Sequence, residues 1–164
     1  MAQLYAGLTV IEILGVAVKK EIDAAKFYRD LAARIPNPII QERFLTLAKE
    51  ERRHRALLQM EYKRLTGETK IPVPQGKYKQ PESFDWDKAS LEDALNYAIR
   101  AERDAQKLYA AAAKTSTDPR GKRMLDYLVE FEKGHERMLV SELNFYKKAP
   151  LWFEEQEDML HVGP

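Results

Sequence analysis

The stretch KEERRHRALL, residues 49–58, carries a glutamate and a histidine three positions apart, at Glu51 and His54. The apolar residues around this pair have the spacing of an amphipathic helix. Residues three apart lie on the same face of a helix, so the carboxylate and the imidazole project together. Glu51 falls within the apolar stripe of that helix, where an unpaired carboxylate would be costly. The stretch therefore predicts a helix that buries a polar pair.

The pattern occurs twice, with a separation of 81 residues. FEKGHERML repeats the pair at Glu132 and His135. A lone glutamate precedes each pair by 30 positions, at Glu21 and Glu102. Two of the three histidines in the chain belong to this arrangement. Two copies of one helical hairpin would place these side chains symmetrically about a pseudo-twofold axis, and this symmetry predicts two bound metal ions instead of one.

Helical periodicity dominates the chain, and no stretch alternates like a half-buried strand. We expect helices from about Thr9 to Arg34, from about Pro38 to Leu65, from Ser90 onward, and from Pro119 to Pro150. Ser90 with Asp93 has the spacing of a capping box, and Pro119 suits a first helical turn. The sequence thus predicts an all-α fold of four helices.

The segment between the second and third helices, about 67–90, contains Pro72, Pro74, Gly76 and Pro81 and has no helical period. A helix of about 26 residues is ~40 Å long, whereas about 23 extended residues span up to roughly 75 Å. The segment can therefore climb the full length of a bundle. Two antiparallel hairpins joined by one long crossover form the ferritin-like arrangement. We expect this bundle over residues 1–150, followed by a short C-terminal tail, 151–164.

Composition excludes several classes of function. The chain has 164 residues, a net charge of +1 and no cysteine. The near-neutral charge gives no case for binding nucleic acid or an acidic membrane surface. Without cysteine there are no disulfides, iron–sulfur clusters or thiol catalysis, which fits a cytoplasmic protein. The apolar run 8–18 is interrupted by Glu12 and is interpreted as the start of a helix, not as a signal peptide.

Four carboxylates in apolar stripes need compensating charge. Two divalent cations would supply it. Structural ion pairing is the competing explanation, but no lysine or arginine occupies those stripes within a turn of the glutamates. Glu50 is an alternative to Glu51, yet the matching position in the second half is Phe131, so the repeat favours Glu51. The remaining alternative is a plain helical bundle whose glutamates are surface charges.

The segments KKEIDAAKFYRDLA…KEERRHRALL and RAERDAQKLYAAAA…FEKGHERML resemble the ferritin-like di-iron carboxylate superfamily, and within it rubrerythrin-type proteins. The resemblance covers about Thr9 to Tyr146. It implies a site in which Glu21 and Glu102 are terminal ligands, Glu51 and Glu132 bridge two iron ions, and His54 and His135 each bind one. Mixed carboxylate and imidazole ligands suit iron, with manganese as the alternative.

Three departures from that family's pattern change what the resemblance implies. The rubredoxin domain needs four cysteines, and this chain has none, so electrons must come from a separate donor protein. A further glutamate usual in rubrerythrins is replaced by Ala105. Bacterioferritins place their haem-binding methionine where this chain has Arg52, so we predict no haem.

Two tyrosines, Tyr28 and Tyr109, lie seven residues after Glu21 and Glu102. The resemblance implies that they hydrogen-bond to carboxylates of the opposite hairpin and orient them. Packing of ordinary core tyrosines is the alternative. His161 has no partner in the repeat and is not expected to be a ligand. Trp152 and the residues after it are expected to form a short helix over a bundle end or a neighbouring subunit.

The leading functional hypothesis is a non-haem di-iron oxidoreductase that reduces hydrogen peroxide or dioxygen while a diferrous centre is oxidised. The rival hypothesis is a ferroxidase or an iron-binding and storage protein of the same superfamily. We expect a homodimer, and the proline-rich crossover makes an exchange of hairpins between two chains conceivable.

Overall fold

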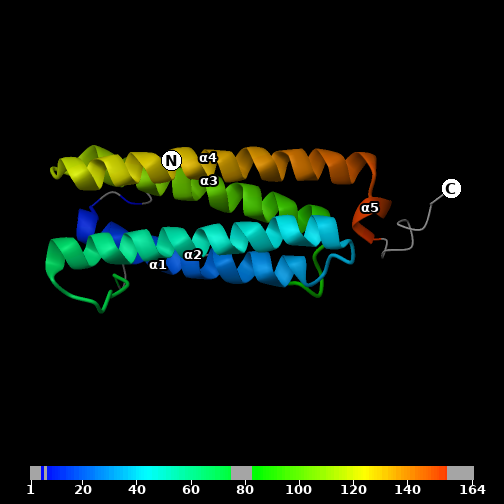
Figure 1. Cartoon of the computed structure of the whole chain (residues 1–164), viewed down its shortest axis with the longest axis horizontal. Coiled ribbons are helices and arrows are strands. Elements are labelled where there is room, and N and C mark those ends of the chain that lie inside the picture. Colours follow the sequence, from blue (N-terminus) through cyan, green and yellow to red (C-terminus); the bar gives the residue numbers. More distant parts are fainter. Residues whose placement is uncertain (1–4, 6, 75–82, 155–164) are drawn as a thin grey trace.

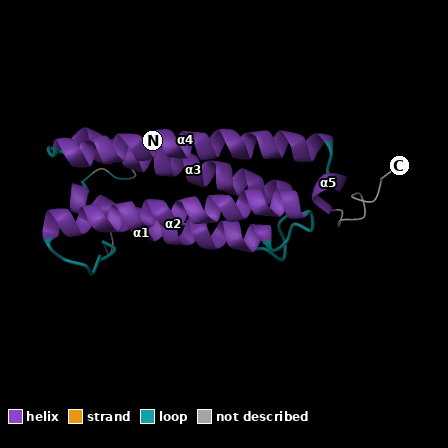
Figure 2. Ribbon diagram, viewed as in Figure 1, coloured by secondary structure: helices purple, strands orange, loops and turns teal. Residues whose placement is uncertain are grey.

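The computed structural model describes residues 5, 7–74 and 83–154. Four long helices lie side by side in an elongated bundle (Figure 1). They are α1 (Val10–Ala32), α2 (Pro38–Thr66), α3 (Leu91–Thr115) and α4 (Pro119–Lys148), followed by the short α5 (Leu151–Glu154). All regular structure in these described ranges is helical (Figure 2). The prediction of an all-α four-helix bundle is confirmed.

Short polar residues fix where the helices begin. Thr9 and Ser90 cap α1 and α3 in capping boxes, the latter with Asp93 as predicted. Asn37 and Asp118 cap α2 and α4, and each is followed by a proline in the first turn. Such side chains accept hydrogen bonds from backbone N–H groups that have no partner within the helix. The first helix ends at Ala32, two residues before the predicted end.

The helices form two antiparallel hairpins, α1 with α2 and α3 with α4. Between the hairpins, α1 packs on α3 more extensively than α2 packs on α4. The helix α2 ends at one end of the bundle, and α3 begins at the other (Figure 1). The chain must therefore cross the full length of the bundle between them, as the length of segment 67–90 predicts.

The first part of the crossover packs tightly against α1 at Gly15. A Cβ added to Gly15 would overlap the carbonyl oxygen of Pro72 and lie 3.6 Å from Cδ of Pro74. We expect Gly15→Ala to lower the free energy of unfolding by about 1–3 kcal/mol, because overpacking outweighs the helix propensity of alanine. Urea unfolding measures this change. Gly134→Ala is the matched control, because its Cβ would meet only Nη2 of Arg137, at 3.8 Å. A Gly15→Ala protein at least as stable as the parent would contradict the contact.

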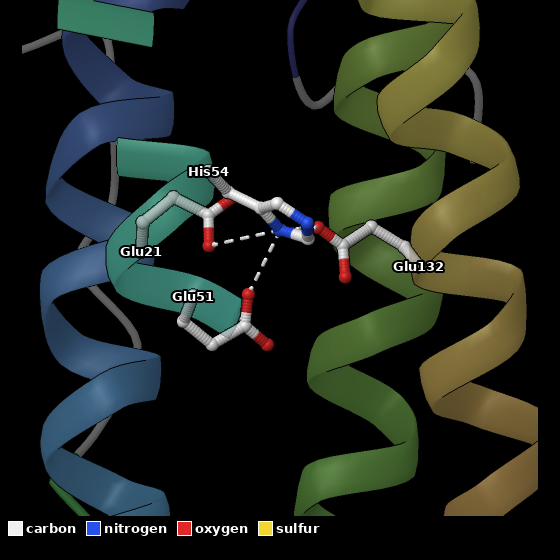
Figure 3. A group of neighbouring side chains, drawn as sticks. All are labelled: Glu21, Glu51, His54 and Glu132. Carbon is white, nitrogen blue, oxygen red and sulfur yellow. Dashed lines mark hydrogen bonds and ion pairs between the residues drawn. The ribbon is translucent and has the colours of Figure 1, made fainter. Parts of the chain in front are cut away.

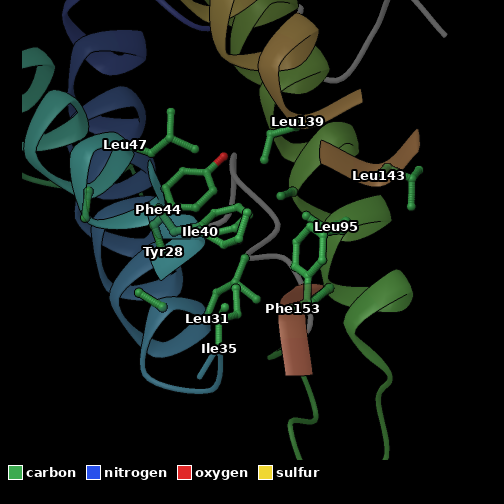
Figure 4. Close-up of a cluster of buried hydrophobic side chains, with 14 of the residues drawn as sticks. Tyr28, Leu31, Ile35, Ile40, Phe44, Leu47, Leu95, Leu139, Leu143 and Phe153 are labelled. Atoms are coloured by element: carbon green, nitrogen blue, oxygen red, sulfur yellow. The ribbon is translucent and has the colours of Figure 1, made fainter. Parts of the chain in front are cut away.

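Two apolar clusters fill the bundle, one toward each end. The first includes Leu31, Phe44, Leu95 and Leu139 (Figure 4). The second is built from residues nearer the opposite end, among them Leu14, Leu58, Tyr109 and Leu125. The clusters are separated along each helix by the positions that carry the repeated glutamates and histidines. A polar layer therefore lies in the middle of an otherwise apolar interior.

The helix α5 covers the end of the bundle. Phe153 is 1% exposed and packs against Phe145 and Tyr146 of α4, with ring centroids 5.7 and 5.2 Å away. His161, together with the rest of the tail after Glu154, lies outside the described residues. Among the described helices, none combines the length and the apolar character that crossing a bilayer would require.

Candidate metal centre

Six side chains form the polar layer, which we call the donor layer. Each of the four long helices contributes at least one of them. They are Glu21 from α1, Glu51 and His54 from α2, Glu102 from α3, and Glu132 and His135 from α4. Each is at most 4% exposed. All six residues singled out in the sequence are thus brought together, and none points to solvent. The alternative of surface glutamates on a plain bundle is wrong for these four positions.

The six side chains divide into two overlapping groups. Glu21, Glu51, His54 and Glu132 form one group, which Figure 3 shows. Glu51, Glu102, Glu132 and His135 form the other. Within each group, one donor atom from every residue lies within 4.8 Å of the others. Because Glu51 and Glu132 belong to both groups, the arrangement fits two adjacent ions bridged by two carboxylates.

Both imidazoles present the same ring nitrogen to the carboxylates. Nδ1 of His54 lies 3.1 Å from Glu51 Oε2 and 3.0 Å from Glu132 Oε1. Nδ1 of His135 lies 3.1 Å from Glu51 Oε1 and 3.0 Å from Glu132 Oε2. The two rings are stacked, with centroids 5.4 Å apart. The contacts of the two imidazoles are therefore nearly related by a pseudo-twofold axis between the two hairpins.

Two buried tyrosines hydrogen-bond to Glu21 and Glu102, the two carboxylates that belong to only one donor group each. The hydroxyl of Tyr28, on α1, donates a hydrogen bond to Glu102 on α3. The hydroxyl of Tyr109, on α3, donates to Glu21 on α1. Each tyrosine thus reaches the carboxylate of the opposite hairpin. Both rings are also packed within the apolar clusters, so these residues combine core packing with orientation of a carboxylate.

Protonation follows the position of each carboxyl. Burial, followed by repulsion from Glu51 and Glu132, raises the pKa of Glu21 well above its ordinary value. Burial and repulsion from Glu51 likewise raise the pKa of Glu102. Burial alone would raise the pKa of Glu51, but hydrogen bonds with His135 and His54 lower it instead. Burial and repulsion therefore favour the protonated form at Glu21 and Glu102, whereas contacts with the histidines favour the ionised form at Glu51.

The histidines respond to the same carboxylates. Burial alone would lower the pKa of His54, but hydrogen bonds with Glu132 and Glu51 raise it to about 9. Contacts with Glu102, Glu132 and Glu51 raise the pKa of His135 further. Protons therefore balance the charge of the carboxylates in the metal-free protein. Two divalent cations would displace these protons. Their charge would balance four ionised carboxylates, and the histidines would then be neutral ligands.

The chemistry of the donors fits a pair of metal ions. Four buried atoms that face into the layer lie close to one another but form no well-aligned hydrogen bond among the described residues, namely Glu51 Oε1, both carboxylate oxygens of Glu132, and His135 Nδ1. Buried polar atoms in folded proteins are nearly always satisfied. These atoms also point into the two groups described above. Bound cations would satisfy them with the oxygen and nitrogen ligands that iron and manganese accept.

One further carboxylate touches the layer, at a position that the repeat argued against as a ligand. Oε2 of Glu50 lies 2.9 Å from Nε2 of His135, on the side of the ring away from the other carboxylates. The Glu50 side chain is 27% exposed. The internal repeat gave no signal for this contact, because Phe131 occupies the equivalent position. The sequence did indicate that Glu50 could approach the layer, because it lies four residues before His54, one helical turn away.

The fold and the donor layer define a ferritin-like protein whose buried glutamates and histidines could hold two metal ions. The chain belongs to the rubrerythrin family, whose model matches residues 12–143. The match runs from the first turn of α1 through α2, the crossover and α3 to Leu143 of α4, so the resemblance drawn from the sequence is confirmed. A comparison with curated proteins gives no match.

Solved structures of similar proteins agree with this assignment. A hypothetical protein from Pyrococcus furiosus is 30% identical, with a TM-score of 0.76, over 87% of this chain and 93% of that one. A Thermotoga maritima protein described as ferritin-like and diiron-carboxylate is 25% identical, with a TM-score of 0.68, over 84% and 95% of the two chains. Bacterioferritin from Rhodobacter capsulatus, 22% identical, shares the fold with a TM-score of 0.73, over 94% of each chain.

Proposed function

We propose that this protein is a non-haem di-iron oxidoreductase that reduces hydrogen peroxide, with dioxygen as the alternative oxidant. The observation that carries the proposal is the pair of buried donor groups sharing Glu51 and Glu132. In this proposal Glu51 and Glu132 would be shared by the two ions, Glu21 and Glu102 would each hold one of them, and His54 and His135 would each supply Nδ1 to one. Two adjacent Fe(II) ions would supply the two electrons needed to cleave the O–O bond, in H2O2 + 2 H⁺ + 2 e⁻ → 2 H2O.

A cavity beside the donor layer supports a small oxidant. It lies between α1 and α3, has a volume of about 80 Å³, and reaches Glu21, Glu51, Glu102 and Glu132. A single water molecule needs roughly 10–15 Å³ of such space, so a molecule the size of peroxide fits. Ala105 lines this cavity, at the position where a rubrerythrin usually carries a further glutamate. The small side chain leaves the approach to the carboxylates open.

Residues around the donor groups orient the carboxylates and keep water out of the bundle interior. Tyr28 and Tyr109 fix the orientation of the terminal carboxylates by hydrogen bonds from the opposite hairpin. The apolar clusters on either side exclude water from the rest of the bundle interior. In this proposal a separate donor protein supplies the electrons that re-reduce the centre, because these 164 residues contain no cysteine to hold an iron–sulfur or rubredoxin-type iron.

The test is stopped-flow mixing of the anaerobic, Fe(II)-loaded protein with hydrogen peroxide. We expect ferric absorbance to appear faster than free Fe(II) is oxidised in the same buffer, with about one peroxide consumed per two Fe(II), as the two-electron balance requires. Glu61→Gln is the matched control, because Glu61 is a buried α2 glutamate that pairs with Arg64 and not with the donor layer. Oxidation no faster than that of free Fe(II) would contradict the proposal.

Ferroxidase activity is the second candidate. It is favoured by the set of six donors, because Ala105 stands where a rubrerythrin usually has an additional carboxylate. It predicts faster oxidation by dioxygen than by peroxide. A storage role further requires a closed shell of many subunits, whereas the oxidoreductase proposal is compatible with a homodimer. Mass measurement in solution, combined with parallel peroxide and dioxygen mixing, separates the two candidates.

A further inference from the structure

The two halves of the donor layer differ in what supports their histidines. On His135, Nδ1 faces the carboxylates while Nε2 lies 2.9 Å from Oε2 of Glu50. On His54, Nδ1 also faces the carboxylates, but Nε2 is buried and has no hydrogen-bond partner in the described part of the chain. The internal repeat is therefore broken at the outer nitrogen of one histidine.

The break has a clear origin in the sequence. Glu50 and Phe131 occupy equivalent positions, 81 residues apart, each directly before a central glutamate. Glu50 reaches across from α2 to His135 on α4. Phe131 cannot accept a hydrogen bond from an imidazole N–H in the way that a carboxylate can, and its ring packs edge-on against both His54 and His135, with centroids 4.7 and 5.4 Å away. The outer nitrogen of His135 thus has a carboxylate beside it, whereas Phe131 supplies none to His54.

This difference matters for a metal-binding imidazole. A neutral histidine that binds a metal through Nδ1 carries its proton on Nε2. A carboxylate that accepts this N–H fixes the tautomer and the ring orientation and makes the other nitrogen a stronger donor. Loss of such a partner typically weakens metal affinity by about 10–100-fold. Glu50 can provide this support to His135, whereas no described residue provides it to His54.

We propose that Glu50 is a positioning residue for His135, and that it makes the half-site of Glu102 and His135 the tighter of the two. The proposal rests on the metal centre put forward above. It gives the two ions a fixed order of binding, with the half-site of Glu21 and His54 filled second. The bridging carboxylates, Glu51 and Glu132, are common to both steps.

Anaerobic titration with Co(II), followed by absorbance and calorimetry, tests the proposal one half-site at a time. Glu21→Ala leaves the His135 half-site intact, and Glu102→Ala leaves the His54 half-site intact. We expect the Glu21→Ala protein to bind its Co(II) about 10–100-fold more tightly than the Glu102→Ala protein. Equal affinities of the two variants would overturn the proposal while leaving the metal centre in place.

Substitution of Glu50 then identifies the cause. Adding Glu50→Leu is expected to weaken Co(II) binding to the Glu21→Ala protein by about 10–100-fold and to leave the Glu102→Ala protein within about threefold. Equal weakening of both half-sites would indicate a general structural effect and would overturn the role of Glu50. Glu42→Gln is the matched control, because Glu42 is an exposed α2 glutamate that pairs only with Lys49 among the described residues.

A gain of function completes the test. Phe131 is only partly buried, so a polar side chain is tolerable there. Phe131→Gln places an amide oxygen beside Nε2 of His54, and we expect it to tighten Co(II) binding to the Glu102→Ala protein. Unchanged or weaker binding would count against the proposal. If the unmodified protein binds no Co(II) at all, the metal centre itself is wrong, and the inference falls with it.

Discussion

Glu51→Ala is expected to reduce the metal content of the iron-loaded protein from about two ions per chain to nearly none. Glu51 belongs to both donor groups, so its removal would take a ligand from both proposed ions at once. It also removes the carboxylate that lies 3.1 Å from Nδ1 of both histidines. Metal analysis after anaerobic loading with Fe(II) and removal of free metal measures the effect. Glu132→Ala should behave in the same way, because Glu132 is the other shared residue.

The control for this experiment is a buried glutamate outside the layer. Glu142 on α4 is 5% exposed and forms an ion pair with Arg43. We expect Glu142→Gln to retain about two metal ions per chain, because an arginine already balances its charge. Circular dichroism shows whether each variant keeps its helices. A folded Glu51→Ala protein that still binds two ions would show that the buried carboxylates do not hold the metal.

The free energy of unfolding of the metal-free protein is expected to fall as the pH rises from about 5 to about 9. Over the same range, the stabilisation that bound metal gives is expected to increase, because the ligands lose their protons more readily. The pKa of His54 rises from 6.5 to about 9 on folding. Its contribution to stability is therefore complete below pH 6.5 and is lost as the pH passes about 9. That change alone corresponds to roughly 3 kcal/mol.

The terminal carboxyls act in the same direction. Folding raises the pKa of Glu21 and Glu102 above 4.5, so they bind protons that the unfolded chain has already released. Stability is lost as the pH rises through their folded values. Thermal unfolding with and without a chelator, at pH 5, 7 and 9, measures both trends. Glu102→Gln should flatten the pH dependence of the metal-free protein, and a metal-free protein that gains stability toward pH 9 would contradict the assignment of these charges.

Much of the fold was predictable because its determinants are local. Ser90 and Asp93 mark the start of α3, and Gly67, with a φ of 76°, adopts the left-handed conformation that ends α2. The end of α1 was placed two residues too late. The helix ends at Ala32 because the next turn tightens: the N–H groups of Arg34 and Ile35 bond three residues back, to Leu31 and Ala32, and Pro36 has no N–H with which to continue.

The candidate site was predictable to the extent that it repeats. Glutamates and histidines at equal spacing in both halves had to converge once two hairpins packed together, and their burial follows from their place in the apolar stripes. The contact between Glu50 and His135 joins residues 85 positions apart and breaks the repeat. It depends on how closely α2 approaches α4, a distance set by packing between hairpins, and no pattern within either hairpin encodes it.

The division of the donor layer between two hairpins has a consequence for how such a site can change. A single hairpin holds one Glu and one Glu-x-x-His, so two identical copies pairing with each other would already supply all six donors. In that homodimer every substitution would appear twice, and the two ions would have to remain equivalent. Joining the copies in one polypeptide through the long crossover removes that constraint. Glu50 and Phe131 stand at equivalent positions with different side chains, a difference that a homodimer of one hairpin could not carry.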